Sequence, residues 1–481
     1  MDWSRVQLDR AAPTPLYLQL CTAVANEIAA GSLQPGDQLP SERKLAERLC
    51  LSRTTAVNAY HELEARGLVR SYRGRGTFIS GRPERLGAQF AWRGKVSPNV
   101  QQHLNRGIRS LITLAPSDTI SFGAGAPATT HFPAETYAAL TQDVLARYPK
   151  DALGFLPTEG HHHLREVIAK REGVRPEEVL IVSGTQQALD LIGRCLLYPQ
   201  DVVVMDWPGY LGAIQTFRLA GAVLVGWDIF GTDLDELEDS FVKRRPKLLY
   251  LNPSFQNPTG RTLSLEQRRA IVDLARTYRI PIVEDEAYRD LYFTAPPPPT
   301  LLELEGDGLV LHLRTFSKTF APGLRLGYVL ADENIIDQLS LVKAQSDLFS
   351  PGLSQLVLAR LLAEGVFDAY THHLRREHRE RAQVMNDTLT AAFAPHAFSW
   401  QKVAGGLYLW TQLGSGNSRD LLNEATKLGV TFALGEHFFP DGAGKRALRL
   451  CFANNEPARI VEGVNRLAEA LHTISALEVG R

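Results

Sequence analysis

Residues 315–328 read TFSKTFAPGLRLGY, a stretch that combines one lysine and one arginine with several small hydroxyl side chains. Lys318 lies close to Thr315 and Ser317, and Arg325 follows it seven residues later. A lysine amine can form a Schiff base with a carbonyl cofactor, and pyridoxal phosphate is the commonest such partner. Hydroxyl groups and a nearby guanidinium suit the phosphate of that cofactor. Most lysines are solvated surface charges, so the rest of the chain must support this interpretation.

The surrounding chain, from about residue 117 to residue 475, alternates apolar runs with helical segments. The apolar runs are VLIVSG, DVVVMDWP, KLLYLNP, PIVEDEAY and LVLHLRTFSK. Continuous apolar strands between amphipathic helices predict an α/β fold with a buried, mainly parallel sheet. Such a sheet binds ligands at the carboxyl ends of its strands.

Polar residues follow these strand ends one after another. Ser183, Gly184 and Thr185 open a helix after the first strand. A small-residue turn at a helix N-terminus can bind phosphate, although it can also be an ordinary helix cap. Tyr210 follows the second strand, where its ring can either stack on a flat cofactor or pack in the core. Asn257 follows the third strand and is available to a phenolic oxygen.

Two charged residues on apolar strands need partners. Asp285 ends the run PIVE, and a pyridinium nitrogen is a cation that would pair with it. Arg449 lies between Leu448 and Leu450 on a later apolar strand, and a buried arginine needs an anion. A substrate or effector carboxylate matches the planar guanidinium, and an internal salt bridge is the alternative.

The first 80 residues show a different pattern. A helical apolar period begins after Pro15 and ends near Gly31, and Ser41 and Ser52 stand where two further helices would be capped. Two short β-like runs, LVRSY and GTFIS, follow. Three helices with a tight turn between the second and third, followed by a β-hairpin, predict a winged helix-turn-helix at residues 12–80.

The third helix of such a domain enters the major groove with its N-terminal residues at the base edges. Those residues are Arg53, Thr54 and Thr55. Arg43 can meet phosphate or guanine, and the hairpin tip at Gly74 leaves room for close approach to DNA. A small helical interaction domain with solvated arginines is the alternative.

Charge supports a nucleic-acid partner for this head. Residues 1–95 hold 14 Lys and Arg against 9 Asp and Glu, whereas residues 96–481 hold 38 against 44. A basic head on an acidic body indicates that the head meets a polyanion. Between them, residues 81–116 mix Arg, Gly, Pro and Gln without a clean period, which predicts an interdomain linker.

Several classes are excluded. The chain has no run of about 18 uncharged apolar residues, so no membrane partner is expected. The charged start MDWSRVQLDR lacks a signal peptide's apolar region, and a cytoplasmic protein is expected. The four scattered cysteines and the HHH run at 161–163 lack ligand spacing, so no metal site is predicted. The segment HHLRREHRERA at 372–382 is interpreted as a solvated helix face, with a second DNA-contacting patch as the alternative.

The head resembles the DNA-binding domain of GntR-type bacterial regulators. The segments that carry the resemblance are PLYLQL, GSLQPGDQLPSERKLAERL, SRTTAVNAYHELEARGLV and RGRGTFIS, which cover residues 12–80 nearly without a gap. The resemblance implies contacts with double-stranded DNA by Arg43, Arg53, Thr54, Thr55 and Gly74.

Residues 117–475 resemble the fold-type I aminotransferases through GAGAP, SGTQQAL, DWPGY, NPTG, VEDEAY, TFSKTFAPGLRLGY, GGLYLW and LRLCFA. The resemblance implies that Lys318 holds pyridoxal 5'-phosphate as an internal aldimine. Asp285 would pair with the pyridine nitrogen, and Arg449 would bind an α-carboxylate. The remaining implied cofactor contacts are Tyr210 on the ring, Asn257 and Tyr288 on its phenolate, and Ser183, Gly184, Thr185, Thr315, Ser317 and Arg325 on its phosphate.

One residue departs from the family's pattern. Phe155, in GFLPTEG, stands where the family usually has a tyrosine that reaches the phosphate of the partner subunit. A phenylalanine has no hydroxyl with which to make that contact.

A GntR-type head on an aminotransferase-like body resembles the MocR subfamily of bacterial transcription regulators. This resemblance implies a homodimer, typically head-to-tail, whose body senses an amine or amino acid effector through an external aldimine. Two alternatives stay open. The body is a working aminotransferase with an autoregulatory DNA-binding domain, or it is a degenerate scaffold that only dimerises the head.

Overall fold

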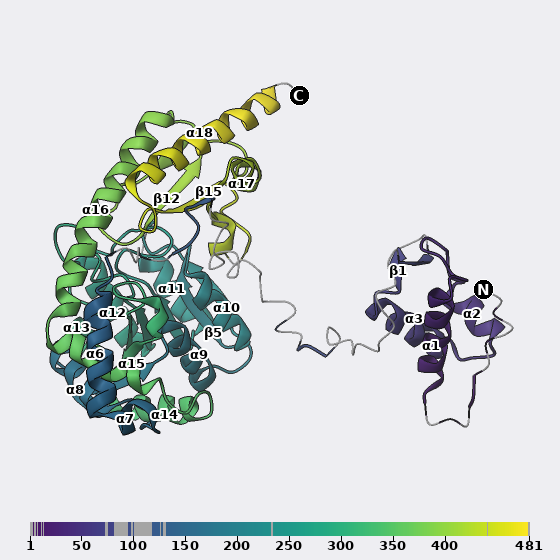
Figure 1. Cartoon of the computed structure of the whole chain (residues 1–481), viewed down its shortest axis with the longest axis horizontal. Helices are drawn as coiled ribbons and strands as arrows, with labels where there is room; N and C mark the ends of the chain where they lie inside the picture. Colours follow the sequence, from purple (N-terminus) through teal and green to yellow (C-terminus); the bar gives the residue numbers. More distant parts are fainter. Residues whose placement is uncertain are drawn as a thin grey trace. The chain divides into compact units, whose positions relative to one another are not determined.

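The computed structural model describes residues 3, 6, 8–10, 12, 14–72, 76–80, 95–97, 100, 118–125, 127, 131–231, 234–439 and 441–479. The chain divides into two compact units, residues 1–102 and 103–481 (Figure 1). The hairpin tip with Gly74 and almost all of the predicted linker lie outside the described residues. No helix in the described ranges is long and apolar enough to cross a bilayer.

The N-terminal unit has the predicted three helices and hairpin. Its elements are α1 (Leu16–Ala29), α2 (Glu42–Arg48), α3 (Arg53–Ala65), β1 (Val69–Tyr72) and β2 (Gly76–Ile79). Both predicted caps are confirmed, because Ser41 Oγ accepts from the N–H of Lys44 and Ser52 Oγ accepts from the N–H of Thr55. Leu45 and Leu63 are buried in the small core between the helices.

A seven-stranded sheet forms the centre of the C-terminal unit. In spatial order its strands are β4 (Val179–Val182), β10 (Gly327–Leu330), β9 (Val310–Thr315), β8 (Ile282–Asp285), β7 (Leu248–Leu251), β5 (Val202–Asp206) and β6 (Val223–Trp227). All neighbours are parallel except β10, which runs antiparallel to both β4 and β9. The short connection from β9 to β10 leaves no room for the helical crossover that a parallel neighbour needs. The prediction of a mainly parallel sheet is therefore confirmed, with this exception.

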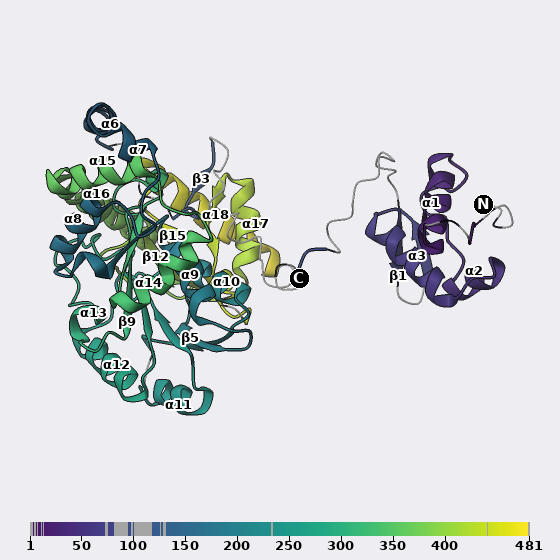
Figure 2. The same ribbon diagram turned by 90° about the horizontal axis from the view of Figure 1, so that it is seen from below.

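Helices surround this sheet, as Figure 1 and Figure 2 show. In the first half of the unit they are α6 (Ala134–Arg147), α7 (Pro149–Leu153), α8 (His162–Glu172), η3 (Pro176–Glu178), α9 (Thr185–Leu196), α10 (Leu211–Leu219), α11 (Leu234–Arg244) and α12 (Leu265–Tyr278). Further along they are α13 (Leu301–Leu304), η4 (Pro322–Leu324), α14 (Glu333–Ala344), α15 (Gly352–Ala363) and α16 (Val366–Ala392). Every residue of β4, β7, β8 and β9 is buried, which explains why these strands are mostly apolar.

A smaller sheet lies in the last part of the chain. Its spatial order is β11 (Phe398–Trp400), β12 (Tyr408–Leu413), β15 (Ala447–Cys451) and β14 (Ala433–Leu434). Near it, β13 (Val430–Thr431) pairs with β3 (Ile120–Ser121). The helical elements of this part are α17 (Ser418–Lys427), η5 (Gly435–Phe438) and α18 (Pro457–Val479). The long helix α16 packs against α18 (Figure 1).

Candidate cofactor site and nucleic-acid interface

The predicted body residues gather where the parallel strands of the large sheet end. Thr185 begins α9 just after β4, and Asp285 is the last residue of β8. Thr315 ends β9, three residues before Lys318. Because parallel strands share one carboxyl edge, residues far apart in the sequence meet there.

Lys318 lies in the turn between β9 and β10, and its ammonium Nζ donates to the carbonyl of Gly125 at 2.5 Å. Burial and, after it, the nearby charge of Arg449 lower the pKa of Lys318 to about 8. The amine is thus closer to its neutral, nucleophilic form than an exposed lysine would be.

Asp285 is buried and only partly satisfied. The hydroxyl of Tyr250 donates to its Oδ2 at 3.0 Å. Its Oδ1 is buried and has no hydrogen-bond partner among the described residues. Burial raises the pKa of this carboxyl to about 6. A buried carboxylate oxygen without a donor is what a pyridinium N–H would satisfy.

Asn257, Tyr288 and Arg449 form one hydrogen-bonded chain. The Asn257 side-chain amide donates to the Tyr288 hydroxyl at 3.2 Å, and its Oδ1 accepts from Arg449 at 2.7 Å. The hydroxyls of Tyr288 and Tyr408 are 3.3 Å apart. Three elements that are distant in the sequence therefore hold these polar groups together.

Arg449 is buried on β15, and its guanidinium also donates to the carbonyl of Gly123 at 2.7 Å. It lies 4.1 Å from the centre of the Tyr408 ring. Its Nε has no hydrogen-bond partner within the described part of the chain, and no described carboxylate lies in ion-pair range of it. The internal salt-bridge alternative thus finds no support, and the group retains hydrogen-bonding capacity for an anion.

The predicted phosphate residues lie at the start of α9 and in the Lys318 loop. Gly184 is the N-cap of α9 with φ of 85°, a conformation that side chains disfavour. Arg325 donates to the carbonyl of Ser183 at 2.8 Å, so its guanidinium lies beside this N-terminus. In the loop, the N–H of Ser317 donates to Thr315 Oγ1 at 3.1 Å. A helix N-terminus beside an arginine is an anion-binding arrangement.

Tyr210 is the N-cap residue of α10, and its hydroxyl donates to Gln186 Oε1 at 3.2 Å. Burial raises the pKa of Tyr210, so its hydroxyl stays protonated at neutral pH. Its ring is one of the partly buried groups that pack against the core under α9 and α10.

Several supporting residues escaped the sequence interpretation. Asn252 donates from its amide to the carbonyl of Asp285, and its Oδ1 accepts from the N–H of Asn257 at 2.7 Å. Asp206 accepts from Gln256 Nε2 at 2.6 Å, and burial raises its pKa to about 7. The signal was available, because Asn252 and Asp206 also lie at strand ends. Tyr250 is different, since nothing in its sequence context distinguishes it from a core residue.

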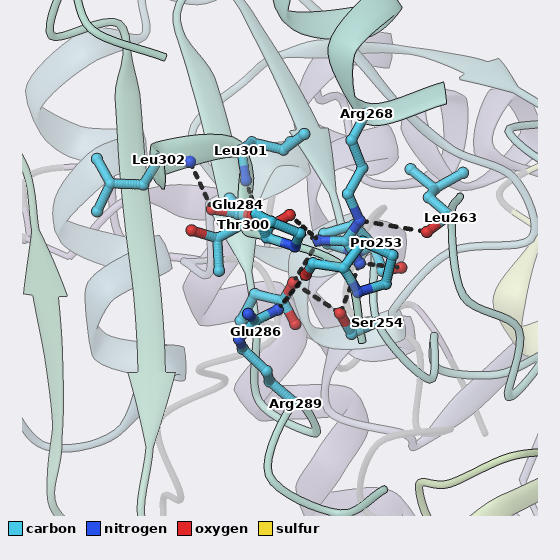
Figure 3. Close-up of polar contacts among 12 residues, drawn as sticks. Pro253, Ser254, Leu263, Arg268, Glu284, Glu286, Arg289, Thr300, Leu301 and Leu302 are labelled. Atoms are coloured by element: carbon cyan, nitrogen blue, oxygen red, sulfur yellow. Dashed lines mark hydrogen bonds and ion pairs between the residues drawn. The ribbon is translucent and has the colours of Figure 1, made fainter. Parts of the chain in front are cut away.

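A buried polar network supports the strand that carries Asp285 (Figure 3). Arg268 on α12 is fully buried and donates to Glu286 Oε1 at 3.1 Å and to Ser254 Oγ at 2.7 Å. It also donates to backbone carbonyls of Leu263, Pro253 and Pro299. The network fixes the backbone on either side of Asp285 and of the turn that holds Asn257.

Phe155 has an 87% exposed side chain, and its ring lies 5.5 Å from that of Phe349. It offers no hydroxyl to any phosphate, so the departure from the family pattern is a real chemical difference at this position.

The described residues that are predicted to contact DNA lie on α2 and α3. Arg53 and Thr54 are exposed in the first turn of α3. Thr55 is half-buried, and its Oγ1 lies 2.7 Å from Ser52 Oγ. Arg43 is exposed on α2 and donates to Glu47 at 3.1 Å. Arg43 thus makes an ion pair with Glu47 on the same helix.

The groups of the body fit pyridoxal 5'-phosphate. Lys318 supplies a partly buried amine, Asp285 has a carboxylate oxygen that lacks a donor among the described residues, and a helix N-terminus with an arginine suits a phosphate. The chain also matches two family models: aminotransferase class I and II over residues 117–467, and bacterial regulatory proteins of the gntR family over residues 16–79.

Similar proteins include both regulators and enzymes. An uncharacterized HTH-type transcriptional regulator, YisV, of Bacillus subtilis is 31% identical over 98% of both chains. The probable rhizopine catabolism regulatory protein MocR of Rhizobium meliloti is 30% identical, again over 98% of both chains. The crystal structure of LysN, an α-aminoadipate aminotransferase of Thermus thermophilus complexed with N-(5'-phosphopyridoxyl)-L-leucine, has a TM-score of 0.76 at 37% identity. That match covers 80% of this chain and 99% of the enzyme.

The enzyme thus matches about four fifths of this chain, whereas the two regulators match nearly its whole length. The chain belongs to the aminotransferase class I and II family and joins that domain to a GntR-type DNA-binding domain, which is the architecture of the MocR-type transcription regulators.

Proposed function

We propose that this regulator uses pyridoxal 5'-phosphate to sense an amine or amino acid and that the bound effector changes how the head binds DNA. When bound at Lys318, the cofactor would supply an imine carbon, at which a second amine can replace the lysine amine. Arg449 would bind the carboxylate of an amino acid effector, and Asp285 would hold the ring nitrogen protonated.

The observation that carries this proposal is the Lys318 amine itself. It is partly buried, its pKa is lowered to about 8, and it lies in one unit with the partly unsatisfied Asp285 and Arg449. Such an amine binds an aldehyde and can also be displaced by a competing amine. The same chain carries the GntR-type head, so amine exchange in the body could change the affinity of the head for DNA.

If two heads bind two DNA half-sites, the DNA affinity would depend on how the two bodies are arranged relative to each other. A homodimer provides this, because helix-turn-helix proteins bind paired half-sites. The effector can bias the arrangement only by binding one form more tightly than the other. We therefore expect effector and DNA to change each other's affinity by the same factor.

The test compares wild-type protein with Lys318→Ala. DNA affinity is measured by fluorescence anisotropy against a panel of amino acids, while absorbance follows the bound cofactor. We expect the mutant to bind DNA like the effector-free wild type and to ignore every effector. A mutant that still responds like wild type contradicts the proposal, and Lys170→Ala, on α8, is the matched control.

A working aminotransferase is the second candidate. It is favoured by the similarity of the body to the Thermus aminotransferase and by the presence of Lys318, Asp285 and Arg449. Sustained release of a 2-oxo acid from an amino acid in the presence of a second 2-oxo acid would support the enzyme. A single spectral change without turnover would support the sensor.

A further inference from the structure

His131, His373 and Glu377 form a cluster that the cofactor chemistry does not use. One ligand atom from each lies within 4.8 Å of the other two. His131 Nδ1 is 2.6 Å from Glu377 Oε1, and His373 Nε2 is 3.6 Å from the same oxygen. His373 and Glu377 are one turn apart on α16, whereas His131 lies just before α6. We propose that this cluster is a binding site for a divalent transition metal of the zinc class.

Unsatisfied atoms point to a missing partner. Glu377 Oε2 and His373 Nε2 are both buried and have no hydrogen-bond partner among the residues that the structure describes. The Glu377 side chain is only 14% exposed, so water does not readily replace that partner. A cation between the three side chains would give His373 Nε2 a partner, and Glu377 would coordinate it through Oε1, the oxygen that both imidazoles approach.

The donor set is one that zinc prefers. Two imidazoles and one carboxylate, with a water in the fourth position, form a tetrahedral zinc site. In such a site the ligand atoms lie about 2.0–2.2 Å from the metal and about 3.3–3.6 Å from one another. The His373–Glu377 distance already meets this requirement. The His131–Glu377 pair must open by about 0.7 Å, and the exposed His131 is free to make that movement.

Two arginines lie near the cluster and must be accommodated. Arg376 donates to His373 Nδ1 at 3.0 Å, which places the ring proton on Nε2. Metal binding through Nε2 requires that proton on Nδ1, and the exposed Arg376 can turn into solvent. Arg381 is held by the carbonyl of Ala453 and by Glu456, and it stays 3.8 Å from Glu377. At that distance Arg381 attracts the Glu377 carboxylate electrostatically but donates no hydrogen bond to it.

The residue next to His131 is anchored in the core. The neighbouring ring of Phe132 lies 5.0 Å from Phe320 and 6.2 Å from Tyr370. Phe320 is two residues beyond Lys318, so the cluster lies against the same core as the cofactor loop. The segment 372–382 was interpreted as a solvated helix face, and this was wrong for its inner side. His378 and Arg381 are buried there.

The test uses full-length, chelator-treated protein and Zn²⁺ alone as the probe. Binding is measured by competition with a chromophoric chelator for wild type, His131→Gln and Glu377→Gln. His372→Gln is the matched control, because His372 is the exposed neighbour of His373 on the same helix. We expect about one tightly bound Zn²⁺ per chain and a loss of at least about tenfold in affinity in both cluster variants only.

A second readout covers variants that fold poorly. Co²⁺ added to wild-type protein should give the intense visible absorption of a four-coordinate site, and Zn²⁺ should abolish it. The proposal is overturned if wild-type protein binds no metal, if its Co²⁺ spectrum is the weak one of the aqua ion, or if His372→Gln loses as much affinity as the cluster variants. In those cases His131 and Glu377 form an ion pair only.

Discussion

Lys318 is the residue on which the chemistry of the body depends. Its amine has lost most of its water, and the positive charge of Arg449 lies nearby, so both effects favour the neutral form. The same burial brings the amine against the Gly125 carbonyl, which partly compensates for the lost water. At neutral pH a larger fraction of this lysine is therefore in its neutral, nucleophilic form than of an exposed lysine.

The first prediction concerns the pH dependence of cofactor uptake. Only the neutral amine attacks an aldehyde, so the uptake rate of apo-protein should rise with pH and level off above about 8 rather than near the ordinary lysine value of 10.5. The carboxyl of Asp285, with a pKa of about 6, titrates below this step. Stopped-flow absorbance across the pH range gives the midpoint, and a midpoint near 10.5 contradicts the prediction.

The second prediction concerns Arg53 in the first turn of α3. Replacing it by alanine should remove the proposed base contact, so binding should weaken by about 1–3 kcal/mol and sequence preference should relax. Arg66, the C-cap residue of α3, is the control, because it lies at the far end of the helix and pairs with Glu62. Anisotropy titrations with duplexes selected from a random pool give both quantities. Equal losses in the two variants would remove Arg53 from the interface.

At the scale of elements, α12, β7 and β8 are joined by the buried charge of Arg268. The guanidinium has Glu286 as its ion-pair partner at 3.1 Å, and four further oxygens accept from it. A buried charge is tolerated only when it is fully paired, so these elements must keep their relative positions. The site residues at the ends of β7 and β8 benefit from this rigidity.

The third prediction follows from that network. Arg268→Ala leaves the buried carboxylate of Glu286 unpaired and should lower the free energy of unfolding of the C-terminal unit by about 3–5 kcal/mol. Arg276→Ala is the control on the same helix, because Arg276 is 40% exposed and pairs only with surface carboxylates. That change should stay within about 1 kcal/mol. Urea unfolding followed by near-ultraviolet circular dichroism measures both, and similar losses would mean that the buried network contributes little.

At the scale of the whole molecule, the chain consists of two compact units. Residues 1–102 and 103–481 each have their own hydrophobic clusters, and the cofactor residues all belong to the second unit. A unit with its own core can in principle fold by itself. The cofactor residues and the GntR-type domain therefore belong to different compact units.

The fourth prediction tests this separation. A fragment of residues 103–481 should take up pyridoxal 5'-phosphate with the same absorption spectrum and the same midpoint pH as the full chain, because the cofactor residues described above all lie in that unit. It should not bind DNA. A fragment that folds but fails to take up the cofactor would mean that the head completes the site.

The sequence by itself determined the local features of both units. Ser41 and Ser52 cap helices because their hydroxyls meet backbone groups only three residues away. The sheet could be predicted because β4, β7, β8 and β9 are buried on both faces and hence mostly apolar, with polar residues toward the ends of β8 and β9. The strand-end rule then placed Lys318, Asp285 and Asn257 in one region.

Only the tertiary structure decided which side chains meet. Tyr250 donates to Asp285, Arg449 binds Asn257, and His131 pairs with Glu377, although each pair is far apart in the sequence. The antiparallel course of β10 was also outside the reach of the apolar pattern, because strand direction leaves no mark on burial. Helix caps and apolar periods depend on residues within a few positions of one another, whereas these contacts depend on how the whole chain closes around its core.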